Sequence, residues 1–121
     1  MQTANRYLAL HGHFCLTVIT ITEMVDGFRQ KQRDIEIEQL TEMIQNEQHT
    51  VFELDFNAAE QAGLILADLR RQGQVIGAGD AFIAAIALVN GLPVVTGNTK
   101  HFERIQNLGY SLQLGNWRNP A

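Results

Sequence analysis

Short runs of apolar and β-branched residues alternate along the chain with longer stretches of helical periodicity. The near-continuous run Phe14 to Thr20 predicts a strand that is covered on both faces. Val51 to Phe56 and Pro93 to Thr96 predict two further strands, and Ser111 to Leu114 predicts a weaker fourth. The alternation of strands with helical segments is typical of a parallel sheet built from βαβ units.

Between these runs the apolar residues recur with the period of a helix. One helix is predicted from Asp34 to Glu47, and a second from about Ala58 to Leu69. Asn57 and Glu60 have the spacing of a capping box at the start of the second helix, and Gly73 is suited to follow its end. Both ends of that helix are therefore marked in the sequence.

A third helix is predicted at Ala81 to Val89, with Asp80 at its N-terminus. Its residues are apolar almost all round, which is typical of a helix buried against a sheet. The elements together predict a three-layer α/β/α fold with a parallel sheet. Ligands of such folds bind outside the carboxyl ends of the strands, so candidate functional residues are expected in Thr20–Glu23, Asp55–Asn57 and Thr96–His101.

The composition is that of one globular domain of 121 residues, with 45% hydrophobic and 18% charged residues. The single cysteine, Cys15, excludes an internal disulfide and is predicted to be a small buried hydrophobe. No apolar run approaches the roughly 20 residues that span a bilayer, and no secretory leader is recognisable, so a cytoplasmic protein without membrane contact is expected. Nine Lys and Arg against 13 Asp and Glu give a net charge of −4, which would repel a polyanion unless local groups attract it.

Three segments together resemble the PIN-domain nucleases, most closely the VapC-type toxins of bacterial toxin–antitoxin pairs. They are Thr17–Met24, Ile76–Ala85 and Pro93–Phe102, and the resemblance extends from about Phe14 to Leu114. It implies a metal-dependent endoribonuclease that hydrolyses RNA phosphodiester bonds. It also implies control by a cognate antitoxin protein and assembly as a homodimer.

The resemblance further implies which residues form the site. Glu23 and Asp80 match acidic ligands of the family, and their oxygens suit Mg²⁺ or Mn²⁺. Asn98 matches a fourth polar position of the catalytic cluster, and Thr96 a neighbouring hydroxyl. Thr96, Lys100 and Arg104 are candidate contacts to the RNA substrate.

One departure from the family concerns its first strand, which is central in the sheet and ends in the first acidic ligand. Met1 to Leu10 has no such strand, and no Asp precedes Asp26. Residues 1–121 are therefore expected to form a single PIN-like domain that is truncated at its N-terminus, with feeble or absent activity. The alternative is a catalytically impaired PIN scaffold that binds antitoxin or RNA without cleaving it. A phospho-acceptor receiver domain is a third possibility, but it needs an acidic pair that the chain lacks.

Structural roles compete with the functional ones at several of these residues. Glu23 could complete a capping box opened by Thr20, and Asp80 or Asn98 could each be a simple helix N-cap. His101 is close to Asn98 in the sequence and is a candidate phosphate contact, but a lone surface histidine without a carboxylate or cysteine partner is expected to be incidental. Gly77 and Gly79 are expected to allow close approach of the chain before Asp80, and they lack the spacing of a dinucleotide-binding motif.

Overall fold

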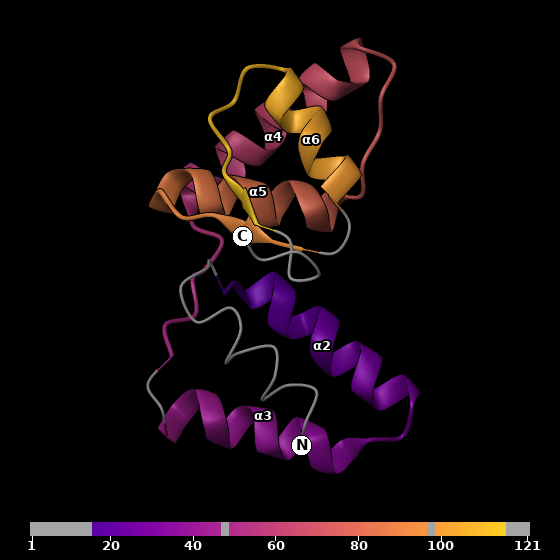
Figure 1. Ribbon diagram of the computed structural model, residues 1–121, viewed down its shortest axis with the longest axis vertical. Coiled ribbons are helices and arrows are strands. Elements are labelled where there is room, and N and C mark those ends of the chain that lie inside the picture. The colour runs from indigo at the N-terminus through magenta and orange to yellow at the C-terminus, as the bar shows by residue number, and fades with distance from the viewer. Residues whose placement is uncertain (1–15, 47–48, 97–98, 116–121) are drawn as a thin grey trace.

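Five helices and two short strands make up the part of the chain that the computed structural model describes, residues 16–46, 49–96 and 99–115 (Figure 1). In chain order these elements are α2 (Val18–Gln30), α3 (Asp34–Asn46), α4 (Phe56–Arg71), α5 (Ala78–Asn90), β1 (Val94–Val95), α6 (Thr99–Asn107) and β2 (Leu114–Gly115).

The strand β1 lies between two groups of helices. It pairs in parallel with β2, with Val94 opposite Leu114. Because successive strand side chains point to opposite faces, Val94 packs into a core formed with α4, α5 and α6, whereas Val95 packs against a second core between α2 and α3. Figure 1 shows the strands between these two helical layers. The predicted three-layer α/β/α architecture with a parallel sheet is thus confirmed.

The prediction of a strand at Phe14 to Thr20 is wrong for its second half, because α2 begins at Val18. The buried side chain of Thr17 caps that helix, and its Oγ1 accepts a hydrogen bond of 3.0 Å from the N–H of Thr20. Thr17 still forms an isolated parallel bridge with Phe52. The β-branched residues therefore favoured a strand locally, while the cap and the packing of α2 place them in a helix.

The strand predicted at Val51 to Phe56 is reduced to that bridge at Phe52, because α4 already begins at Phe56. Asp55 is the N-cap of α4, and its Oδ1 accepts a hydrogen bond of 2.8 Å from the N–H of Ala58. The capping box predicted at Asn57 and Glu60 is consequently wrong by two residues. The weaker strand predicted at residues 111–114 begins only at its last residue and continues to Gly115.

The three predicted helices are confirmed as α3, α4 and α5. Gly73 follows the end of α4 with a positive φ of 69°, as expected for a residue just beyond a helix. The helix α5 is the most buried element, with six residues in the core: Ala81, Ile83, Ala84, Ala85, Ile86 and Ala87. The predictions for Phe14, Cys15, Glu47 and the first strand fall outside the described residues, and the assignment of one domain stays a prediction.

Candidate active site

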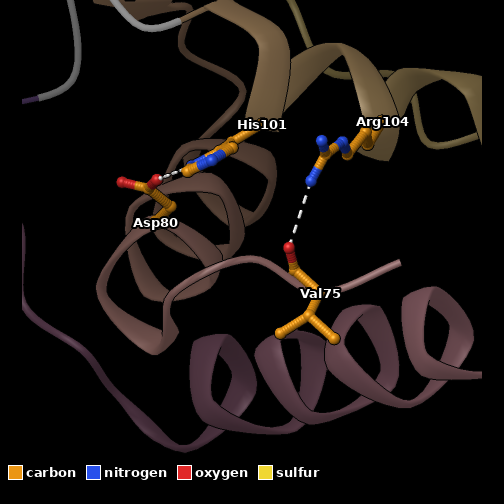
Figure 2. Close-up of polar contacts among 4 residues, drawn as sticks. All are labelled: Val75, Asp80, His101 and Arg104. Atoms are coloured by element: carbon orange, nitrogen blue, oxygen red, sulfur yellow. Dashed lines mark hydrogen bonds and ion pairs between the residues drawn. The ribbon is translucent and has the colours of Figure 1, made fainter. Parts of the chain in front are cut away.

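A short polar contact near the start of α5 joins Asp80 to His101. Asp80 is the third residue of α5, and His101 lies in the first turn of α6. His101 Nδ1 is 2.6 Å from Asp80 Oδ2, and Figure 2 shows the two side chains pointing toward one another. The side chain of His101 keeps 34% of its surface exposed, and that of Asp80 keeps 22%. The contact is therefore partly shielded, and solvent still reaches both groups.

The structure excludes the capping role that the sequence left open for Asp80. Gly77 is the N-cap residue of α5, and it makes no side-chain capping hydrogen bond. A carboxylate in the first turn still benefits from the positive end of the helix dipole, typically by about 0.3–1 kcal/mol. Asp80 is thus an acidic group in the first turn of α5 that can have a role other than capping.

Glu23 approaches the same place from α2. Its Oε2 would lie 3.5 Å from a Cβ atom built on Gly79, the residue that precedes Asp80. Burial raises the pKa of the Glu23 carboxyl above its ordinary value of 4.5, and the negative charge of Asp80 raises this pKa further. The carboxyl groups of Glu23 and Asp80 are therefore close enough to repel one another.

The roles of the neighbouring residues are clarified by this arrangement. Thr17 caps α2, so the capping box that Thr20 would open with Glu23 is wrong, and Glu23 lies on the second turn of the helix. A Cβ on Gly79 would meet the Glu23 carboxylate only at an ordinary contact distance, so the structure does not require a glycine there for close approach. Among the described residues, no atom lies within 4 Å of a Cβ built on Gly77, so no close approach within this part of the chain explains that glycine.

The predicted substrate contacts lie along β1 and α6. Thr96 directly follows β1, and its N–H donates a hydrogen bond of 3.1 Å to the carbonyl of Gly115. Lys100 is exposed on α6. Arg104 donates a hydrogen bond of 3.1 Å from Nη1 to the carbonyl of Val75 (Figure 2). The predicted site residue Asn98 lies outside the described residues.

His101 is the residue whose role the sequence underestimates. The expectation that His101 lacks a carboxylate partner is wrong, because it contacts Asp80, 21 positions earlier in the chain. The available signal was its position three residues after Asn98, about one helical turn. That spacing could place His101 near the site, but it could not identify Asp80 as the group it contacts.

Hard oxygen donors dominate the chemistry of this place. Glu23 and Asp80 offer carboxylate oxygens, which Mg²⁺ and Mn²⁺ prefer, and Mg²⁺ is commonly held by only one or two carboxylates together with waters and substrate phosphates. Among residues 16–46, 49–96 and 99–115, no three His, Cys, Asp or Glu side chains are grouped so that they could hold an ion. The donor pair fits a hard divalent cation whose remaining ligands come from water and substrate.

No helix in the described part of the chain is long and apolar enough to cross a membrane.

Comparison with known sequences gives consistent matches over most of the chain. A family profile described as PIN domain matches residues 2–108. The tRNA(fMet)-specific endonuclease VapC of Shigella flexneri is 33% identical over 106 residues, covering 86% of this chain and 78% of that protein. Ribonuclease VapC2 of Haemophilus influenzae is 29% identical over 119 residues, covering 97% of this chain and 85% of that protein.

Solved structures agree with these sequence matches. VapBC-1 from nontypeable Haemophilus influenzae superimposes with a TM-score of 0.68 and 28% identity, covering 88% of this chain and 76% of that chain. DNA-bound VapBC from Salmonella typhimurium gives a TM-score of 0.69 and 29% identity, covering 93% of this chain and 82% of that chain. The receiver-domain alternative is thereby excluded. The fold, the profile match and the sequence identities show that this chain belongs to the PIN-domain family.

Proposed function

We propose that this chain is the endoribonuclease toxin of a toxin–antitoxin pair, hydrolysing RNA phosphodiester bonds with Mg²⁺ or Mn²⁺ held by Glu23 and Asp80. The observation that carries the proposal is the approach of these two carboxyl groups, which come from different helices of a PIN-domain chain. The names of its relatives, an endonuclease specific for tRNA(fMet) and a ribonuclease, favour RNA as the substrate.

The two carboxylates have a common task in this proposal. Burial raises the pKa of the Glu23 carboxyl, and the negative charge of Asp80 raises this pKa further. A cation between the two carboxylates would relieve their repulsion. Bound there, a divalent cation supplies an activated water and neutralises charge that develops on the phosphoryl oxygens. The residues of the chain hold the cation and orient the phosphodiester beside it.

The remaining predicted residues contribute to substrate binding. Thr96 directly follows β1 and offers a hydroxyl, and Asn98, which lies outside the described residues, offers an amide two positions later in the sequence. Lys100 is exposed on α6 and can meet a phosphate in solution. Arg104 can also contact a phosphate, through the guanidinium N–H groups that do not bond to Val75. Local cations are needed because the net charge of −4 repels RNA overall.

The proposed partner is a cognate antitoxin protein. The solved structures that resemble this chain at 28% and 29% identity are VapBC complexes, which supports control of the chain by a second protein. We further propose that the chain forms homodimers and acts in the cytoplasm, where its RNA substrate is found. Light scattering of the purified chain tests the dimer.

The test of the enzymatic proposal is the variant Asp80→Asn. The amide keeps the shape of the side chain but removes its charge, so RNA cleavage that requires Mg²⁺ or Mn²⁺ should be lost while the melting temperature changes little. Glu60→Gln, an exposed neutralisation on α4, is the matched control and should cleave like the natural chain. Cleavage by Asp80→Asn at the natural rate, or cleavage that persists in EDTA, would contradict the proposal.

A further inference from the structure

The contact between His101 and Asp80 is shorter than an ordinary surface ion pair. At 2.6 Å between Nδ1 and Oδ2, it has the short separation of a charge-assisted hydrogen bond. It links the first turns of α5 and α6, which lie in different parts of the sequence. The bond is made by Oδ2 of the Asp80 carboxylate and not by Oδ1.

The helix that carries His101 is firmly seated. Phe102 and Ile105 are 2% and 0% exposed and belong to the core that α6 shares with α4 and α5. Arg104 lies about one helical turn after His101, and it donates a hydrogen bond to the carbonyl of Val75, in the segment that leads into α5. Figure 2 shows that His101 and Arg104 both reach toward this part of the chain. The imidazole of His101 therefore contacts Asp80 from a helix that is packed into the core.

We propose that His101 is a positioning residue of the nuclease site: it donates Nδ1–H to Asp80 Oδ2 and thereby holds the carboxylate with its other oxygen turned to the divalent cation. The inference rests on the proposed function, because it requires Asp80 to be a ligand. Carboxylates that bind metals are commonly oriented by such outer hydrogen bonds, and loss of the outer partner typically costs about 10–100-fold in metal affinity or activity. His101 thus acts through Asp80.

Two substitutions separate the hydrogen bond from the bulk of the ring. In His101→Asn the side-chain amide nitrogen can occupy the place of Nδ1 and donate to Asp80, whereas His101→Ala removes the donor. Mn²⁺ affinity, measured by electron paramagnetic resonance on the full chain, should fall on the order of 10-fold or more in His101→Ala and largely survive in His101→Asn. Glu103→Gln, exposed on the same helix, should bind Mn²⁺ like the natural chain.

Two further measurements exclude a merely structural role. The cleavage rate of His101→Ala should recover at high Mn²⁺ concentration, because the ligand is misaligned and not lost. In the metal-free protein, long-range proton–nitrogen spectra should show a protonated Nδ1 on His101, with a signal that shifts in Asp80→Asn. Equal Mn²⁺ affinity in the natural chain and His101→Ala, whatever the melting temperatures, would overturn the inference.

The outcomes for His101 and for the proposed function are distinguishable. If Asp80→Asn loses cleavage but His101→Ala binds Mn²⁺ like the natural chain, the nuclease proposal stands and the positioning role fails. If the natural chain and Asp80→Asn bind Mn²⁺ with the same affinity, or neither binds it, the nuclease proposal and the positioning role both fail.

Discussion

Glu23 combines two effects that act in the same direction on one carboxyl group. Partial burial between α2 and the start of α5 raises its pKa above 4.5, and the charge of Asp80 raises it further. A raised pKa means that the folded chain holds the Glu23 proton more tightly than the unfolded chain does. The ionised form of Glu23 therefore opposes folding, as is common for groups retained for function.

The pH dependence of stability follows from the sign of this shift. Below pH 4.5, Glu23 is protonated in both the folded and the unfolded chain, so its charge does not lower the free energy of unfolding. As the pH rises through the pKa that Glu23 has in the folded chain, the ionised carboxylate lowers the free energy of unfolding relative to an uncharged side chain. In metal-free buffer, Glu23→Gln should therefore melt at a higher temperature than the natural chain near neutral pH.

The difference in melting temperature between Glu23→Gln and the natural chain should shrink toward zero below pH 4.5. Thermal melts of both chains across this range measure it, with Glu103→Gln as the control for loss of one exposed negative charge. A stabilisation that stays constant with pH would show that the Glu23 proton is not its cause.

At the scale of single elements, the helix starts depend on short polar side chains whose positions the sequence leaves ambiguous. Asp55 and Asn57 are both good capping residues, and either could open α4. The structure assigns the role to Asp55, whose Oδ1 accepts from the N–H of Ala58, so Asn57 lies within the helix and is exposed. Helix interiors disfavour Asn relative to Ala.

These two positions form a matched pair of substitutions. Asp55→Ala should lower the free energy of unfolding by about 1 kcal/mol, within the 0.5–2 kcal/mol typical of a lost cap. Asn57→Ala should leave it unchanged or raise it by a few tenths of a kcal/mol. Urea denaturation followed by circular dichroism measures both. The reverse ranking would restore the capping box predicted at Asn57.

At the scale of the whole molecule, two cores lie on opposite sides of β1. The larger is formed by α4, α5 and α6, and the smaller is centred on Leu16, Phe28 and Leu40 between α2 and α3. The strand joins them, because Val94 belongs to the first core and Val95 packs against the second. The candidate site depends on both, since Glu23 comes from α2 and Asp80 from α5.

This coupling predicts that damage to the smaller core destabilises the whole chain. Leu40 is 1% exposed, so Leu40→Ala should cost about 2–5 kcal/mol in the free energy of unfolding. Ile35 lies on the same helix but is 70% exposed, so Ile35→Ala should stay within about 0.5 kcal/mol of the natural chain.

Urea denaturation of the Leu40→Ala and Ile35→Ala variants should show a single transition for each. A separate early transition in Leu40→Ala, with hydrogen exchange lost only in α2 and α3, would mean that the two cores unfold independently.

The sequence by itself determined the parts of this protein that depend on near neighbours in the chain. The apolar periodicity predicted α3 and α4, and the apolar run from Ala81 predicted the buried α5, because helices bury one face or all faces according to that pattern. The motifs around Glu23 and Asp80 were sufficient to recognise the PIN family. The pairing of Pro93 to Thr96 in a parallel sheet was also predicted, although only Val94 and Val95 form β1.

Only the tertiary structure decided what depends on distant partners. Residues 17–20 are β-branched and suit a strand, but the Thr17 cap and the packing of α2 place Val18–Thr20 in a helix, because tertiary packing outweighs propensities of about 1 kcal/mol or less. The bond between His101 and Asp80 spans 21 positions and leaves no trace in local periodicity. Such a contact exists only because the packing of α6 against α5 brings the two side chains together.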